Sequence, residues 1–249
     1  MTFFNIIIPL YNVEKWISRC LKTVKAQDYK NYRVAIVNDC STDDSAATIE
    51  KEIEGDDRFS LITTEKNGGA LNSTFAGIEH LQPNDEDVVL VLDGDDWFAR
   101  KDVLTILDNT YSNNDCLMTY GSYIEFPSNV RGKFSRQLPE NVVKKKLFRS
   151  TPWMTSHIRT FKYKLWKSVR REDVLGSDGE IYRMAGDLPV MFPMLEMAEE
   201  RSLYIKDILY VYNRTNPLNE DKVNHNLQLS IEDEVRRKMV YPRLEDMND

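Results

Sequence analysis

The chain of 249 residues contains only three cysteines, Cys20, Cys40 and Cys116, which are widely spaced and form no CxxC pair. Scattered cysteines in odd number are typical of reduced thiols and argue against a disulfide framework. No apolar run approaches the ~20 residues that cross a bilayer. Residues 1–5 lack the basic region and cleavage site of a signal peptide. These absences predict a cytoplasmic protein without a transmembrane segment.

The glycine-rich motifs of the common nucleotide sites are also missing. The absence of GxGxxG disfavours a nicotinamide dinucleotide site, and the absence of GxxxxGK[ST] excludes a P-loop NTPase. Neither HExxH nor the EF-hand pattern occurs. The composition is globular, with 41% hydrophobic and 10% aromatic residues, and the length suits one α/β domain with a sizeable core.

The first 97 residues alternate between short apolar runs and amphipathic segments. Each apolar run reads as a strand, and the segment after it places its apolar residues on one helical face. This alternation predicts an α/β fold, a doubly wound and mostly parallel sheet with right-handed crossovers. The expected strands are residues 3–8, 34–37, 59–62 and 88–92.

Capping residues and later elements can also be predicted. Asn12 is expected to cap the first helix, and Ser41 or Thr42 the second. The second half of the chain is expected to contain a helix over 100–111, a strand over 116–123, a late hairpin or two edge strands over 203–205 and 208–212, and a terminal helix marked by Leu227, Ile231, Val235 and Met239.

The most informative stretch is the fourth apolar run, which leads directly into Asp93, Gly94, Asp95 and Asp96. In an extended backbone Asp93 and Asp95 project to the same side, whereas Asp96 points elsewhere and is a candidate helix cap. Ligands of open α/β sheets bind at the carboxyl ends of strands. Oxygen ligands there suit Mg²⁺ or Mn²⁺ that also holds a diphosphate. The simpler alternative is an acidic surface turn, because Asp-Gly is a strong turn signal.

Four motifs in order resemble the family-2 glycosyltransferases of GT-A fold: IIIPLYN at 6–12, VNDCSTD at 37–43, NGG at 67–69 and LDGDD at 92–96. The resemblance covers residues 3–100 well, and short members of this kind occur in bacteria and bacteriophages. It implies a nucleotide-sugar donor, most often a UDP-sugar, in the cytoplasm of a bacterium or a phage-infected host. It also implies a GT-A fold and a metal-dependent, inverting transfer.

The resemblance also implies roles for single residues. Asp39 would contact the uracil, Tyr11 and Glu14 would line the nucleoside pocket, Asp93 would face the ribose, and Asp95 would bind the metal together with Asp93. A clamped divalent ion stabilises the diphosphate leaving group as a Lewis acid. The full set of matched donor residues is Pro9, Tyr11, Glu14, Asp39, Asn67, Gly69, Asp93, Gly94 and Asp95.

A general base for the attacking hydroxyl must come from the second half of the chain. Asp187 opens an apolar helix and resembles the family's base, which lies in an acidic motif at a helix start. The structural alternative is a helix N-cap. Asp178 and Glu180 are the reserve candidates. Arg214 and His225 could contact the diphosphate, but solvated loop positions are the preferred interpretation for both.

The segment from Arg131 to Arg171 is strongly basic, with thirteen Lys and Arg and a single acid, Glu140. Such one-sidedness in a chain of net charge −7 favours an anionic acceptor, although a solvated face is the simpler explanation. Two acceptors fit: a phosphate-linked glycan or lipid, and DNA with hydroxymethylated pyrimidines. The expected acceptor contacts are Trp153, His157, Arg159 and Lys162.

We therefore expect one GT-A domain over residues 1–249, with a donor half at 1–97, an acceptor and catalytic half at 98–215 and a tail at 216–249. Two alternatives remain. A sugar-nucleotidyltransferase would carry a glycine-rich basic loop after the first strand, where this chain has Pro9, Leu10, Tyr11 and Asn12. A non-catalytic sugar-nucleotide-binding module is disfavoured by the presence of both the DxD motif and a candidate base.

Overall fold

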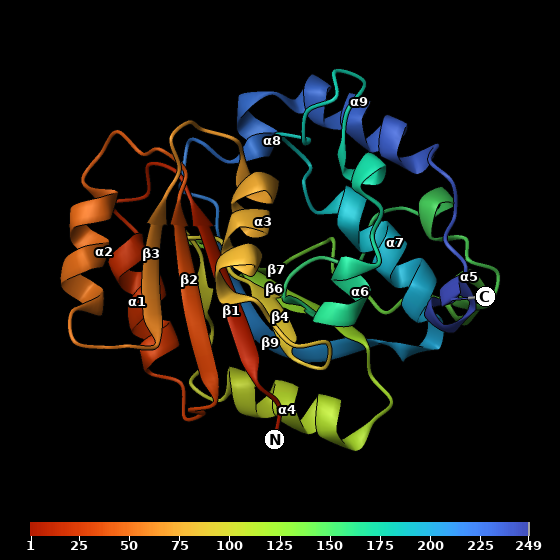
Figure 1. Cartoon of the computed structure of the whole chain (residues 1–249), viewed down its shortest axis with the longest axis horizontal. Helices are drawn as coiled ribbons and strands as arrows, with labels where there is room; N and C mark the ends of the chain where they lie inside the picture. Colours follow the sequence, from red (N-terminus) through yellow and green to blue (C-terminus); the bar gives the residue numbers. More distant parts are fainter. Residues whose placement is uncertain (249) are drawn as a thin grey trace.

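A computed structural model describes residues 1–248 and shows one curled sheet with helices on both faces (Figure 1). The strand order is β3-β2-β1-β4-β8-β6-β9-β5, and β7 pairs with β6. The four strands expected in the first half are present and parallel, so the predicted α/β class is confirmed. They are β1 (Phe4–Leu10), β2 (Tyr32–Asn38), β3 (Phe59–Thr63) and β4 (Val88–Val91).

The rest of the sheet mixes directions. The strand β8 (Arg159–Lys162) runs antiparallel between β4 and β6 (Met118–Phe126). The strand β9 (Ser202–Asn213) is parallel to β6, with short β5 (Trp97–Phe98) and β7 (Val130–Arg131) at the margins. The expected late hairpin is wrong, because residues 202–213 form a single strand. Its register against β6 shifts beside Ser122, so exposed residues 206 and 207 lie in an irregularity rather than in a turn.

The apolar runs of the parallel strands are continuous because both faces of the sheet are covered. Ile6 and Ile8 of β1 point into a core with α1 (Ile17–Lys25), α2 (Ser45–Ile53) and α4 (Val103–Asn113). Ile7 points into the opposite core, whose helices are α3 (Ala70–Leu81) and α7 (Leu188–Ala198). Figure 1 shows α3 and α7 on the side of the sheet away from α1 and α2.

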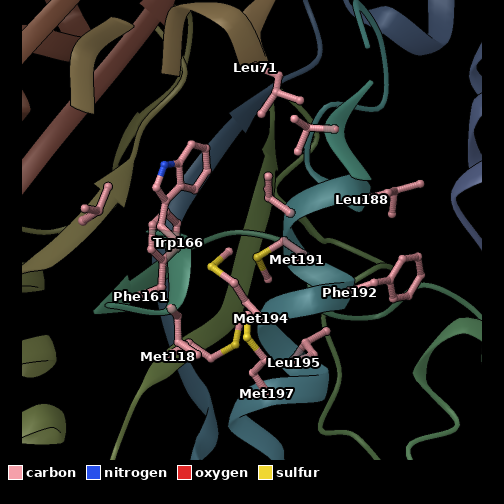
Figure 2. Close-up of a cluster of buried hydrophobic side chains, with 14 of the residues drawn as sticks. Leu71, Met118, Phe161, Trp166, Leu188, Met191, Phe192, Met194, Leu195 and Met197 are labelled. Carbon is pink, nitrogen blue, oxygen red and sulfur yellow. The ribbon is translucent and has the colours of Figure 1, made fainter. Parts of the chain in front are cut away.

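The helix α7 is buried along its whole length. Met191, Met194 and Met197 are at most 1% exposed and lie on the side of α7 that faces the strands, whereas Phe192 points the other way (Figure 2). Opposite them, Phe161 stacks on Trp166 of α6 (Tyr163–Lys167) with ring centroids 5.5 Å apart. Flexible methionines fill this irregular space as core residues.

The C-terminal segment packs on the α7 side through α8 (Glu220–Val223) and α9 (His225–Arg236). A buried ion pair anchors it: Arg149 contacts Glu196 of α7 at 2.6 Å and donates to the Val235 carbonyl. Within residues 1–248, no helix is long and apolar enough to cross a bilayer. The remaining short helices are α5 (Glu140–Lys144) and 3₁₀ turns at Phe148–Ser150, Arg171–Val174, Glu199–Arg201 and Leu244–Asn248.

The predicted helix caps are wrong, since α1 begins only at Ile17. Asn12 has φ = +52°, and its side-chain oxygen accepts the backbone N–H of Thr42, in the loop after β2. The N–H of Asn12 in turn donates to Ser41 Oγ at 2.9 Å. These polar residues therefore tie the loops after β1 and β2 to each other, at the carboxyl ends of the two strands.

Candidate active site

A cleft of about 1060 Å³ opens at the carboxyl ends of β1, β2 and β4. The loops after these strands form one wall. The opposite wall comes from the β6–β7 turn, the segment before β8, the start of α7 and the C-terminal segment. Twelve of the fourteen residues predicted for the site line it: Pro9, Tyr11, Asp39, Asn67, Gly69, Asp93, Gly94, Asp95, Trp153, His157, Arg159 and Asp187.

The structure places the other two predicted residues outside the cleft. The side chain of Glu14 accepts the backbone N–H of Asp44 at the start of α2. Lys162 pairs with Glu86 at 2.7 Å, because the antiparallel register sets it opposite Val88 at the amino end of β4. Only the first residue of β8, Arg159, reaches the carboxyl end of β4. Lys162 therefore does not belong to the wall where an acceptor contact was expected.

Asp39 organises the glycine loop that precedes α3. Its carboxylate is 2% exposed and accepts the backbone N–H groups of Gly68 and Gly69, the latter at 2.7 Å. Gly69 has φ = +87°, and a Cβ there would lie 2.9 Å from the carbonyl oxygen of Arg183. The loop after β2 thus fixes the loop after β3, and that loop in turn contacts the segment that leads to Asp187.

The acidic residues after β4 do not continue the extended strand. The N–H of Asp96 bonds back to the carbonyl of Asp93 at 2.9 Å, so the chain turns. The sequence suggests Asp96 as a helix cap, but in the structure Asp96 caps no helix. Its side chain is fully buried and anchors the turn. Its carboxylate accepts the hydroxyl of Tyr210 at 2.6 Å and the N–H of Asn213 at 2.7 Å. Burial, together with the charges of Asp95 and Asp93, raises the pKa of Asp96 well above its usual value.

All three acids line the cleft, but Asp93 and Asp95 are partly exposed whereas Asp96 is fully buried. The Tyr210 hydroxyl oxygen also lies 3.2 Å from the Asp93 carboxylate, and the Asn216 amide donates to Asp95 at 2.7 Å. Burial raises the pKa of Asp93, although Arg159 and the Tyr210 hydroxyl act in the opposite direction. Burial likewise raises the pKa of Asp95 to about 6. Both carboxylates are therefore in a site where a cation would stabilise their charged forms.

His157 lines the cleft close to Asp93 and Asp96. Its ring stacks on Tyr210 with centroids 4.4 Å apart, and its Nδ1 is buried without a hydrogen-bond partner. Burial and the charge of Arg159 lower its pKa well below the usual value, so the ring is neutral. Ligand atoms of Asp93, Asp96 and His157 lie within 4.8 Å of one another. Neutral imidazole and carboxylate donors fit a divalent transition metal such as Mn²⁺, and within this group Asp96 is already engaged by Tyr210 and Asn213.

Asp187 precedes α7, but its side chain does not cap that helix. Instead its Oδ2 lies 2.8 Å from Nη1 of Arg159, and Nη2 of the same arginine lies 3.6 Å from Asp93. The geometry thus disfavours the capping interpretation and links the two acidic groups through one guanidinium. The reserve candidates Asp178 and Glu180 are exposed in a turn outside the cleft lining, where Asp178 accepts the N–H of Glu180.

Most Lys and Arg side chains of the basic segment take part in ion pairs. Seven of its thirteen Lys and Arg pair with acids outside the segment, and Arg149 is buried against Glu196. The basic side chains that do line the cleft come from several elements: Arg131, Lys133, Arg159, Arg183, Arg214 and Arg236. The members of the segment that form ion pairs are Lys144, Lys146, Arg149, Arg159, Lys162, Lys164, Lys167 and Arg170.

Several residues in or beside the cleft could not be identified from the sequence. Tyr210 and Asn216 contact the acidic turn from positions more than 100 residues away, and no local motif marks them. Arg214 and His225, interpreted as solvated loop residues, also line the cleft. The apolar run over residues 208–212 marks a strand, but it does not reveal that Tyr210 faces the acidic turn.

Fold and cleft together define an α/β protein with an acidic ligand site at the carboxyl ends of parallel strands. A family model described as glycosyl transferase family 2 matches residues 5–171. The chain belongs to this family. The structure is similar to the crystal structure of S. aureus TarS 1–349 in complex with UDP-GlcNAc, with a TM-score of 0.65 at 19% identity over 90% of this chain and 61% of that one. This likeness confirms the GT-A fold.

Two curated relatives show how the chain compares in length. A glycosyltransferase named GlyA from Streptococcus pneumoniae serotype 4 is 25% identical over 222 residues, covering 84% of this chain and 30% of that protein. An uncharacterized glycosyltransferase of Haemophilus influenzae is 32% identical over 123 residues, covering 49% of this chain and 48% of that protein. The chain therefore spans half or less of the length of these two relatives.

Proposed function

We propose that the protein is a metal-dependent, inverting glycosyltransferase that moves a sugar from a UDP-sugar to a hydroxyl of a phosphate-bearing acceptor. The observation that carries the proposal is the meeting of Asp93, Asp95 and Asp187 in one cleft, with Arg159 between Asp93 and Asp187. This arrangement provides acids for a metal-bound diphosphate and, across the cleft, a separate carboxylate for the acceptor.

The donor would occupy the wall made by the loops after β1, β2 and β3. Tyr11 is 37% exposed there and offers an aromatic face for a base, next to Asp39 and Asn67. Asp39 would face the uracil while its carboxylate keeps the glycine loop in place. The complex of TarS with UDP-GlcNAc supports a UDP-sugar as the donor.

The metal site would use Asp95 and Asp93, whose raised pKa values come from burial without a cation. A divalent ion bound there supplies Lewis acidity to the departing diphosphate. His157, with its buried and unpartnered Nδ1, fits as an additional ligand near Asp93. Asp96 is engaged by Tyr210 and Asn213 and would orient the turn. A neighbour of similar fold, a mannosyltransferase with GDP-Man and Mn²⁺, supports a divalent ion.

Asp187 would act as the general base. One of its oxygens contacts Arg159, and the carboxylate, 27% exposed, lines the cleft, so the other oxygen can accept the proton of an acceptor hydroxyl. A single base opposite the leaving group suits direct displacement, which inverts the anomeric centre. Asp178 and Glu180 cannot act as this base, because both lie in the exposed turn outside the cleft lining.

The acceptor would be a phosphate-bearing glycan or lipid, bound by cleft arginines and by Trp153. Arg131, Lys133 and Arg183 line this part of the cleft, and guanidinium groups bind phosphate in bidentate fashion. TarS is named a poly(ribitol-phosphate) β-N-acetylglucosaminyltransferase, which supports a phosphate-bearing acceptor. Duplex DNA has less support, because eight of the thirteen basic side chains of the segment pair with acids and are not free to bind backbone phosphates.

The test is nucleotide release from a panel of UDP-sugars, with Mn²⁺ or a chelator. Parallel reactions would contain poly(ribitol phosphate), a polyprenyl-phosphate-linked sugar, or duplex DNA with 5-hydroxymethylcytosine. Release that requires metal and a phosphate-bearing glycan or lipid is expected. Nucleotide release only in the presence of modified DNA would identify DNA as the acceptor in place of a glycan or lipid. Formation of a UDP-sugar from a sugar phosphate and UTP, without transfer, would instead identify a nucleotidyltransferase.

A further inference from the structure

Arg159 pairs with acids of both walls of the cleft, with Asp187 at 2.8 Å and with Asp93 at 3.6 Å. Arg159 is only 9% exposed, so burial and the two carboxylates together hold its guanidinium in place. Its backbone is equally fixed, since Arg159 pairs with Val91 of β4, two residues before Asp93. A buried guanidinium in a rigid sheet is a stable reference point, because its planar fork binds carboxylates in defined directions.

Asp187, in contrast, follows a stretch with little regular structure. Residues 175–187 contain only an isolated bridge between Leu175 and Ile181 before α7 begins, and Ala185 adopts φ = +50°. The Asp187 side chain makes no capping bond to α7. Its carboxylate instead contacts Arg159, with Oδ2 2.8 Å from Nη1. The orientation of this carboxylate therefore depends on the sheet, through the arginine.

We infer that Arg159 is a positioning residue for Asp187: it binds Oδ2 and thereby presents Oδ1 to the acceptor hydroxyl. This inference rests on the proposed function and replaces the expectation that Arg159 binds the acceptor directly. A general base must lie within hydrogen-bond reach of the proton that it removes. Displacing such a group by 1 Å costs about 10²-fold in rate. Loss of Arg159 should accordingly lower kcat and leave the KM values for donor and acceptor nearly unchanged.

The experiment compares Arg159→Ala, Arg159→Lys, Asp187→Asn and the double variant Arg159→Ala/Asp187→Asn in the full chain. We expect Arg159→Ala to lower kcat by about 10²-fold, Arg159→Lys to lower it less, and guanidinium ion to restore part of the Arg159→Ala activity. The double variant should be no slower than Asp187→Asn alone and should not respond to guanidinium. A residue that only supports the fold would give additive losses.

Arg170→Ala is the matched control, since Arg170 also pairs with an aspartate at 2.8 Å, Asp173, but does not line the cleft. It should keep kcat within about twofold. Thermal melting of each variant separates misfolding from lost chemistry. If Arg159→Ala does not fold, the same comparison is made with Arg159→Lys and the double variant Arg159→Lys/Asp187→Asn.

Three results would overturn the inference while sparing the proposed function: an unchanged kcat, a rise in acceptor KM alone, or additive losses in the double variant. If wild-type protein transfers no sugar from any donor to any acceptor, the proposed function fails and the inference fails with it.

Discussion

Tyr210 donates its hydroxyl to Asp96 over 2.6 Å, joining β9 to the acidic turn across 114 positions of sequence. Both side chains are fully buried. The same hydroxyl lies 3.2 Å from Asp93, so one phenol supports two of the three carboxylates. The shape of the acidic turn therefore depends on a strand from the other half of the chain.

The first prediction concerns this hydroxyl. Tyr210→Phe should destabilise the protein by about 1–3 kcal/mol, because it leaves a buried carboxylate of Asp96 with one acceptor unpaired. Urea unfolding monitored by circular dichroism measures the change. Tyr163→Phe is the control: Tyr163 is only partly buried, and we expect a change of about 0.5 kcal/mol or less. Equal stabilities for Tyr210→Phe and wild type would show that the bond contributes nothing.

The second prediction tests the base. Asp187→Asn should lower the transfer rate by about 10²–10⁴-fold, the range for loss of a general base. Its melting temperature should stay close to that of the wild type, because the amide can still accept a bond from Arg159. Initial-rate measurements with saturating donor and acceptor give the effect. Asp178→Asn should retain activity, and the reverse pattern would move the base into the exposed turn.

The third prediction follows from the raised pKa of Asp95, about 6 in the folded protein against a usual value near 3.8. A carboxyl group whose pKa is raised on folding favours the folded state below pH 4 and disfavours it progressively up to and beyond pH 6. With a chelator present, the melting temperature of Asp95→Asn minus that of the wild type should therefore increase by a few °C as the pH rises from 4 to 7. A constant difference in melting temperature between the two proteins across that pH range would contradict a raised pKa of Asp95.

The fourth prediction concerns the contact between Gly69, in the loop after β3, and Arg183, in the segment that leads to Asp187. Gly69→Ala would place a Cβ 2.9 Å from the Arg183 carbonyl oxygen and would strain a residue at φ = +87°. We expect a rise of about tenfold or more in donor KM, because the N–H of Gly69 must stay with Asp39. Gly179→Ala is the control: it has the similar φ of +78° with open space around it, so it isolates backbone strain from the collision.

The fifth prediction addresses the buried ion pair of Arg149 and Glu196, whose side chains are 6% and 0% exposed. Arg149→Met should destabilise the protein by about 3–5 kcal/mol, since it leaves a buried carboxylate unpaired. The double variant Arg149→Met/Glu196→Leu should recover much of that loss. Denaturant unfolding of the three proteins provides the test, and a double variant less stable than Arg149→Met would show that the pair itself is strongly favourable.

The parallel half of the fold could be predicted because its information is local. Continuous apolar runs indicate strands buried on both faces, and the polar residues that follow them mark the edge where Asp39, Asn67 and Asp93 meet. The second half was harder to predict. Lys206 and Asp207 suggest a turn, yet ladder bonds to β6 carry the strand past them. Pairing between distant strands depends on tertiary packing that local propensity does not specify.

The site shows the same division. Spacing predicts Asp93 and Asp95 as site residues and resemblance predicts Asp187, and all three line the cleft, but nothing in the sequence pairs Asp187 with Arg159. The buried role of Asp96 was missed because a short acidic motif does not reveal which carboxylate meets a tyrosine 114 residues later. A count of charges along the chain likewise does not reveal the acids, such as Glu86 and Glu196, that pair with the basic segment in the fold.

The position of β8 has a practical consequence for dividing the protein into parts. Because β8 lies between β4 and β6, the strand that leads to Asp93 is flanked on one side by a segment from the second half. A fragment ending at residue 97 would expose the backbone donors and acceptors of Val88–Val91 along an open apolar edge, a template for pairing with other chains. Such a fragment should aggregate on expression, and a truncation that keeps β4 covered must extend at least through Lys162.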